Sequence, residues 1–270
     1  MNKYKRIGLF IVIFGLIGIR FINVLKRPMY LDEGIYMSWA EAMSRSRDNA
    51  YVSLSDGKTP LFYWSMSWLD PLIGNYLLTG RIISILSGLV TALSWVIIFY
   101  LNFNFKISLI FLILFLISPY GVFIERLAFS DSLMLCLASL SLLFLILFKK
   151  NIDKKKKLNL SVILMGFSGL FMGMSFAVKT SAKLFFVGYI LVFLFWFADY
   201  IFRKKDIKRF LILLLGLVLY IAMYREIINC FRVGGHILWN SISDKEKLMV
   251  YAPSQVLKIL LSNPLYIFNY

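Results

Sequence analysis

The sequence predicts an all-α fold: a polytopic bundle of about seven transmembrane helices, with juxtamembrane helices in the first extracytoplasmic loop. The mean hydropathy is +0.77, and 17% of the residues are aromatic, which is far outside the range of water-soluble domains. Several apolar runs approach the length of about 20 residues that a helix needs to cross the hydrocarbon core. Basic residues gather between these runs and not along one face of a soluble fold.

The apolar runs define the predicted spans. The run 107–123 is interrupted by Pro119, and the run 210–224 has only 15 residues, so these two carry the weakest signal. The count is therefore seven, give or take one. The tract 248–270 is broken by two prolines and is predicted to be interfacial or to lead to an eighth span. The predicted spans are 7–25, 82–101, 107–123, 132–148, 160–178, 184–202 and 210–224.

The net charge of +16 is arranged as in a membrane protein of the plasma membrane and not as in a nucleic-acid-binding domain. Half of the 30 lysines and arginines lie in four short connections, before span one and after spans two, four and six. The positive-inside rule places these connections and the N-terminus in the cytoplasm. Of the 14 acids, 11 then lie on the extracytoplasmic side, where we expect the chemistry.

The outer loop 26–75 is predicted to fold back onto the membrane surface as two short helices. From Glu33 to Arg45 the apolar residues recur at helical spacing. Asp32 stands where an N-cap is expected, and a second helix is predicted to begin just after Pro60.

The topology also gathers ionisable groups at the outer ends of the spans. Such groups are costly near a bilayer, so a functional role is the default interpretation. They are Asp32, Glu33, Asp56, Lys58, Arg81, Glu125, Arg126, Asp131, Lys179 and Lys183.

Five short motifs follow one another over residues 30–183. They are Asp32-Glu33-Gly34-Ile35-Tyr36; Asp56 to Trp64; Gly80-Arg81-Ile82-Ile83-Ser84; Ser118-Pro119 with Arg126 and Asp131; and Val178-Lys179-Thr180. In this order they resemble the GT-C fold glycosyltransferases, in the branch of the protein O-mannosyltransferases and the aminoarabinose transferase of lipid A. Residues 1–224 would then form the catalytic transmembrane module, and 225–270 an extracytoplasmic loop. Family members continue with more spans, so a second chain supplying them is one alternative.

The resemblance implies a transferase that moves a sugar from a polyprenyl-phosphate donor to an acceptor hydroxyl of unknown nature, with inversion. Asp32 would be the general base, and partial burial and the neighbouring Glu33 would raise its pKa. Positive charge would bind the lipid phosphate that leaves. The residues for that role are Lys58, Arg81, Arg126 and Lys179. Asp131, Tyr36, Tyr63 and Trp64 would bind the acceptor or the sugar.

Two departures from the family pattern bear on cofactors. Gly57 and Ile35 stand where relatives often carry an acid and a base, which argues against aminoarabinose specificity and against a metal ion. No cofactor is therefore assigned, although a divalent metal stays open. The only histidine, His236, is a weak candidate ligand because it has no neighbouring ligand set.

Structural interpretations compete with the functional ones. Asp32 could only cap a helix, and Lys58 or Lys179 could extend to lipid headgroups. Arg126 could form an ion pair with Asp131 or Glu125. The whole chain could instead be a non-enzymatic lipid-binding or transport protein, or an inactive fragment of a transferase.

Overall fold

The computed structural model of the chain describes residues 13–46, 49–154, 158–203 and 206–239. All regular elements in these ranges are helical, and they contain no strand. The predicted all-α class is therefore confirmed.

The described helices follow one another with short connections. Residues 13–21 are helical and lead into the 3₁₀ turn η1 (Val24–Lys26). The other elements are α2 (Leu31–Arg45), η3 (Val52–Asp56), α3 (Leu61–Ile73), α4 (Tyr76–Asn102), α5 (Phe105–Ile117), α6 (Pro119–Glu125), α7 (Ser130–Asp153), α8 (Leu158–Val178), η4 (Thr180–Ala182), α9 (Lys183–Ala198), the π-helical turn η5 (Asp199–Arg203) and α10 (Ile207–Trp239).

Among the described residues, five helical segments are long and apolar enough to cross a membrane. They are Tyr76–Asn102, Ser130–Asp153, Asn159–Val178, Thr180–Phe202 and Ile207–Ile228. A sixth span results if α5 and α6, which meet at an angle of 62°, are counted together. These six match predicted spans two to seven. The first predicted span, 7–25, extends into residues outside the described ranges, so the total of seven is not confirmed.

The bend between α5 and α6 has a local cause. Pro119 has no backbone N–H to donate, and its ring disfavours the helical conformation in the residue before it. Ser118 accordingly leaves the helix, and its hydroxyl accepts a hydrogen bond from Gly121 N at 3.3 Å to cap α6. The interruption predicted at Pro119 is confirmed as a broken helix.

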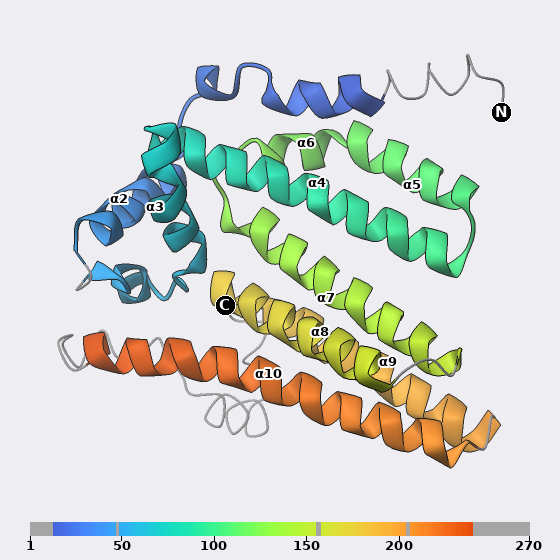
Figure 1. Cartoon of the computed structure of the whole chain (residues 1–270). Helices are drawn as coiled ribbons and strands as arrows, with labels where there is room; N and C mark the ends of the chain where they lie inside the picture. Colours follow the sequence, from blue (N-terminus) through green and yellow to red (C-terminus); the bar gives the residue numbers. More distant parts are fainter. Residues whose placement is uncertain (1–12, 47–48, 155–157, 204–205, 240–270) are drawn as a thin grey trace, which may run out of the picture.

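The long helices run back and forth along one direction (Figure 1), so their ends form two groups. The starts of α4, α7 and α9 and the ends of α6 and α8 lie at the end of the bundle where α2 and α3 pack. We call this the α2–α3 end. The ends of α4, α7 and α9, which precede the basic connections in the sequence, lie at the opposite end, which we call the basic end. Which of the two ends faces outward stays a prediction.

Close approach of α8 and α10 depends on two glycines. A Cβ added to Gly169 would lie 2.7 Å from Tyr220 O, and one added to Gly173 would lie 2.7 Å from Ile227 Cβ. Gly166, three residues before Gly169, has nothing within 4 Å of such a Cβ. Small residues let helices pack closely, and Gly169 and Gly173 do so here, whereas Gly166 does not.

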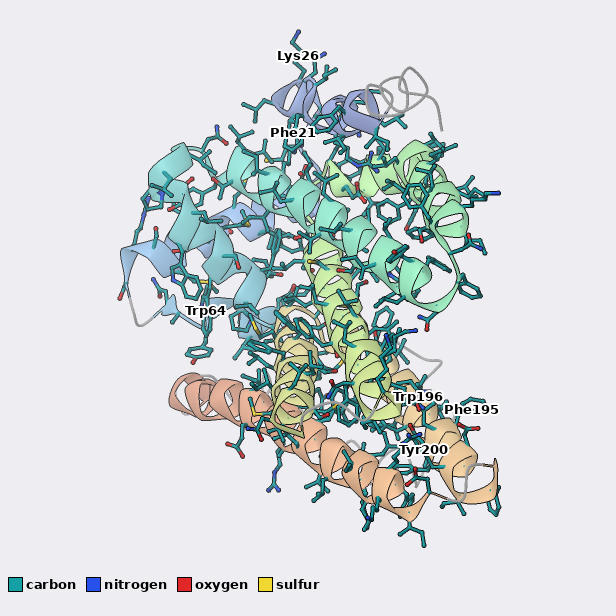
Figure 2. The ribbon with its side chains drawn as sticks, turned by 45° about the vertical axis from the view of Figure 1, so that its right-hand side comes forward. Phe21, Lys26, Trp64, Phe195, Trp196 and Tyr200 are labelled. Carbon is teal, nitrogen blue, oxygen red and sulfur yellow. The ribbon has the colours of Figure 1, made fainter. Side chains whose placement is uncertain are left out.

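The basic end is held together by a polar network between α7 and the turn η5. Lys149 Nζ donates to Tyr200 OH at 2.8 Å and to Asp153 Oδ2 at 3.0 Å. The hydroxyl of Tyr200 in turn donates to Asp153 Oδ1 at 2.7 Å. Figure 2 shows Trp196 and Tyr200 in this region, close to Phe195. Phe195 is 70% exposed, as expected for a side chain on a lipid-facing surface.

Helix α10 differs from its prediction. It does not end at residue 224 but continues to Trp239, so the first part of the predicted loop 225–270 is helical. Residues 240–270, and with them the tract 248–270, lie outside the described part of the chain.

Candidate functional site

The N-terminus of α2 determines where the two neighbouring acids point. The helix begins at Leu31, with Tyr30 as its N-cap residue, so the predicted N-cap Asp32 lies inside the first turn. Glu33, the third residue of the helix, reaches back and accepts a hydrogen bond from Tyr30 N at 3.0 Å. The capping function expected of Asp32 is therefore performed by Glu33.

Glu33 is fully buried and has four donors around its carboxylate. Arg81 Nε donates to Oε1 at 2.9 Å and Arg81 Nη2 to Oε2 at 2.7 Å. Ala128 N donates to Oε1 at 2.7 Å, and Tyr30 N is the fourth donor. Burial alone raises the pKa of Glu33, but the hydrogen bonds from Arg81, Ala128 and Tyr30 outweigh it, so the pKa is lowered and the group is ionised.

Arg81 is also fully buried, and protein acceptors use all of its N–H groups. Besides Glu33 it donates to Val24 O at 2.5 Å, to Arg27 O at 3.3 Å and to Pro28 O at 3.2 Å. An arginine has five N–H donors, and each of them is engaged here. In this arrangement Arg81 has no donor for a lipid phosphate, contrary to its predicted role, and it holds the chain between η1 and α2 in place.

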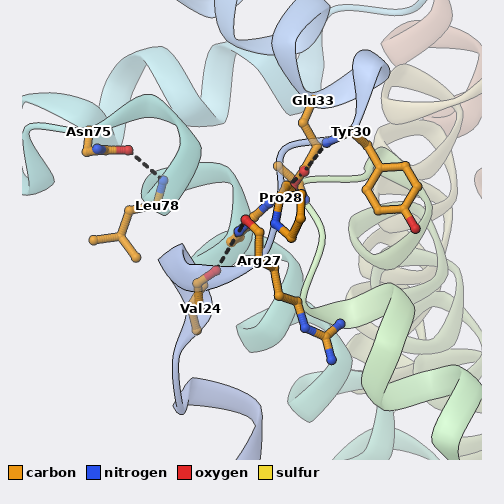
Figure 3. A network of polar contacts seen from close by, with 9 residues as sticks. Val24, Arg27, Pro28, Tyr30, Glu33, Asn75 and Leu78 are labelled. Atoms are coloured by element: carbon orange, nitrogen blue, oxygen red, sulfur yellow. Dashed lines mark hydrogen bonds and ion pairs between the residues drawn. The ribbon is translucent and has the colours of Figure 1, made fainter.

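The motif that contains Arg81 also fixes the start of α7. A Cβ added to Gly80 would lie 2.7 Å from Ala128 Cβ, so only a glycine allows this approach. One turn later Ser84 Oγ donates to Phe129 O at 3.1 Å. Figure 3 shows part of this network, with Glu33 bonded to Tyr30 N and with Val24 and Pro28, whose carbonyl groups accept hydrogen bonds from Arg81. Because Asp131 follows directly in α7, this network also sets the position of that carboxylate.

The side chain of Asp32 points away from the buried network around Glu33. It is exposed, whereas its neighbour Glu33 is buried, because successive residues of a helix lie on different faces. The expected partial burial of Asp32 is therefore wrong, and the neighbouring Glu33 carboxylate is bound to Arg81.

One turn after Asp32 lies a buried pair of tyrosines. Tyr36 and Tyr63 are 7% and 1% exposed, and the centroids of their rings lie 5.2 Å apart. Burial raises the pKa of Tyr36 to about 12, with further contributions from the negative charges of Asp32, Asp131 and Asp56. The negative charges of acids on α2, η3 and α7 thus all act on the phenol of Tyr36 at the α2–α3 end.

The predicted sugar-binding role does not fit the position of Tyr63. Its ring packs between Tyr36, at 5.2 Å, and Trp39, at 5.0 Å, and has no exposed face. Trp64 is half-buried, and its indole N–H donates to Ala50 O at 2.5 Å, which ties the loop after α2 to α3. Both residues therefore contribute to folding of the loop.

Lys58 follows a turn that requires glycine. Gly57 has φ +68°, in the left-handed region, and lets Lys58 N donate to Ser53 O at 3.0 Å. Lys58 is partly exposed, and it lies two residues after Asp56, one of the acids that act on Tyr36.

Lys179 and Asp131 form an ion pair at the α2–α3 end of the bundle. Lys179 Nζ lies 2.6 Å and 2.8 Å from the two carboxylate oxygens, and the side chains are 36% and 47% exposed. The expected pairing of Arg126 with Asp131 or Glu125 is wrong, because Asp131 binds Lys179 and Glu125 binds Arg20. Water and a ligand can reach the Lys179–Asp131 pair.

A second buried ion pair escaped the sequence analysis. Arg20 Nε donates to Glu125 Oε2 at 2.6 Å, and Nη1 donates to Leu116 O at 3.1 Å. A Cβ added to Gly88 would lie 2.3 Å from Glu125 Cδ, so the carboxylate rests on this glycine. A signal existed: Arg20 is the one charged residue inside the apolar run 7–25, where a charge must find a partner.

The described residues contain no group of three or more His, Cys, Asp and Glu side chains that could hold a metal ion. The side chain of His236 lies outside the part that the structure describes, so its candidate role as a ligand stays a prediction.

No protein-family model matches the chain, and comparison with curated proteins and with solved structures found no match either. The function must therefore be argued from the residues and their geometry.

Proposed function

We propose that the protein is a GT-C-like glycosyltransferase that uses a polyprenyl-phosphate sugar at the extracytoplasmic face of the membrane. The N-terminus would be cytoplasmic, and the α2–α3 end would face outward. The acceptor, a protein, lipid or glycan hydroxyl, is left open.

The observation that carries the proposal is the opposite placement of two adjacent acids. Glu33 is buried and saturated with hydrogen bonds, so it can hold α2 in place but cannot react. Asp32 is exposed on the same helical turn, at the end of the bundle where Asp56 and Asp131 also act on Tyr36. A carboxylate on a rigid, internally anchored helix is well suited to accept a proton in a fixed direction.

The roles follow from charge and exposure. Asp32 takes the proton of the acceptor hydroxyl as its oxygen forms a bond to the anomeric carbon, and the bond from that carbon to the lipid phosphate breaks. The phosphate leaves as an anion and needs positive charge more than it needs a proton. Lys58 and Lys179 are half-exposed and supply that charge, while Arg81 does not take part because its donors are used.

The Lys179–Asp131 pair has a further use in this scheme. Because the pair is partly open to water, a phosphate oxygen can replace Asp131 as the partner of Lys179 without leaving a buried charge behind. Asp131 is then free to orient the acceptor.

The test uses the purified protein in lipid nanodiscs with a panel of polyprenyl-phosphate hexoses, pentoses and amino sugars. The proposal expects release of polyprenyl phosphate with at least one donor, and no release with Asp32→Asn. The non-enzymatic alternative expects binding of the lipid without release by either protein. Binding by the wild type without turnover on any donor and acceptor would overturn the proposal.

A further inference from the structure

Four arginines cluster where η1 meets α6 and α4, and only two of them have a carboxylate partner. Arg20 binds Glu125 and Arg81 binds Glu33. Arg27 and Arg126 form no ion pair among the residues that the structure describes. The cluster therefore carries about two uncompensated positive charges, which is costly near a membrane unless an anion is bound.

Both remaining arginines have buried N–H groups without an acceptor. They are Nη1 of Arg27 and Nε of Arg126. Buried polar groups without partners are rare in native proteins, and binding of an ion or ligand is one reason for them. Arg126 also donates through Nη2 to Ile22 O, so its side chain is held in position.

The two side chains face the same region. Figure 3 shows Arg27 pointing away from Glu33, and its guanidinium lies over the ring of Phe123 in α6, 5.3 Å from the ring centroid. The pKa of Arg126 is lowered by burial and by the positive charges of Arg27 and Arg81, as expected for guanidinium groups that lie close together.

An apolar groove begins at Arg27. It has a volume of about 460 Å³ and runs between the helix of residues 13–21 and the broken helix α5–α6. Its other lining residues are Leu16, Ile19, Leu116, Ile117, Pro119, Val122 and Phe123. Ile19 and Ile117 are about half-exposed, so the groove opens onto the apolar surface of the bundle. A free phosphate would use only the arginines, whereas a lipid would use the groove as well.

We propose that Arg27 and Arg126 bind the phosphate of one anionic bilayer phospholipid, and that an acyl chain of this lipid lies in the groove. The two guanidinium groups carry positive charge, which attracts the phosphate anion. Their N–H donors also lie in a plane that suits the phosphate oxygens. This lipid would neutralise the cluster and fasten the first helix to α5 and α6. The site is independent of the proposed transferase activity, because it requires neither Asp32 nor a sugar donor.

Native mass spectrometry of the purified full chain with phosphatidylglycerol tests the proposal. We expect one retained lipid per chain, with an affinity at least about tenfold lower in Arg27→Gln/Arg126→Gln. Arg27→Lys/Arg126→Lys keeps the charge but loses the planar donors, so its affinity should lie between those of the wild type and the double glutamine variant. The matched control is Arg45→Gln, which removes an exposed arginine that is paired with Glu41 on α2.

Three further measurements distinguish a bound phospholipid from an uncharged lipid and from free phosphate. Diacylglycerol, which lacks the phosphate, should bind poorly, and excess inorganic phosphate should not displace phosphatidylglycerol. Val122→Trp, which fills the groove, should abolish retention, and it decides the matter if the double glutamine variant does not fold. The proposal is overturned if the double glutamine variant or Val122→Trp retains the lipid like the wild type. Equal retention of diacylglycerol, or displacement by equimolar polyprenyl phosphate, would overturn it too.

Discussion

Glu33 and Arg81 come from different helices and form a fully buried bidentate ion pair, with distances of 2.9 Å and 2.7 Å between their nitrogen and oxygen atoms. Glu33 caps the N-terminus of α2 and accepts a hydrogen bond from Ala128 N. Arg81 donates hydrogen bonds to three carbonyl oxygens of the chain before α2. The pair thus connects the segments on which Asp32 and Asp131 lie.

Removal of the charge on Glu33 should destabilise the protein strongly. Glu33→Gln leaves Arg81 buried without a counter-charge, and breaking a buried pair in this way costs about 3–5 kcal/mol. Thermal unfolding in detergent should show a large loss of stability. Glu41→Gln, which removes an exposed acid from the same helix, should stay within about 1 kcal/mol of the wild type. Similar losses in the two variants would contradict the structural role of the pair.

The stability should also depend on pH through Glu33. Its pKa in the folded protein lies below the ordinary value of 4.5, so the unfolded chain binds the proton more readily. The contribution of Glu33 is fully present above pH 4.5 and is lost as the pH falls from there through the folded-state pKa. Unfolding of the wild type and of Glu33→Gln from pH 7 downward should show a stability difference that shrinks below about pH 4.5. A difference that stays constant would show that Glu33 does not titrate as we infer.

Two glycines on α8 offer a matched test of helix packing. Gly169→Ala would place a methyl group 2.7 Å from Tyr220 O, a backbone atom that cannot move aside, and should destabilise by about 1–3 kcal/mol. Gly166→Ala meets nothing within 4 Å and should be neutral or stabilising by up to about 1 kcal/mol. Unfolding midpoints of the two variants provide the comparison, and equal effects would contradict the close contact of α8 with α10.

The proposed orientation can be tested by cysteine labelling in intact cells. Ser55→Cys lies exposed in η3 at the α2–α3 end, and Lys106→Cys lies exposed at the basic end. A membrane-impermeant maleimide should label Ser55→Cys from outside and Lys106→Cys only after permeabilisation. The parent of both variants is Cys230→Ser, and its remaining cysteine, Cys136, is buried and supplies the background. The reverse pattern would place the α2–α3 end in the cytoplasm and would exclude the proposed donor site.

Much of the fold follows from hydropathy, because an apolar run of the right length has few alternatives to a helix in a bilayer. Predicted spans two to seven therefore match described helices. Helix ends were less predictable: α10 continues to Trp239 although its apolar run is short. Backbone hydrogen bonding can extend a helix beyond the segment that hydropathy identifies.

The site was predictable in its parts but not in its pairing. The sequence indicated Glu33, Arg81, Asp131 and Lys179 as a group, because all of them lie at the outer ends of predicted spans. It could not show that Arg81 binds Glu33, since their pairing depends on how α2 rotates about its axis. Asp32 was expected to be the partly buried acid, yet a single helical step reverses the two roles.

The most direct test of the central claim compares sugar transfer by Asp32→Asn with transfer by the wild type in nanodiscs, using the donor on which the wild type turns over. Asparagine keeps the shape of the side chain but cannot accept the proton, so the rate should fall by about 10²–10⁴-fold while the unfolding midpoint stays unchanged. Glu41→Gln on the same helix should transfer at the wild-type rate. Transfer by Asp32→Asn within about twofold of the wild type would contradict the assignment of Asp32 as the general base.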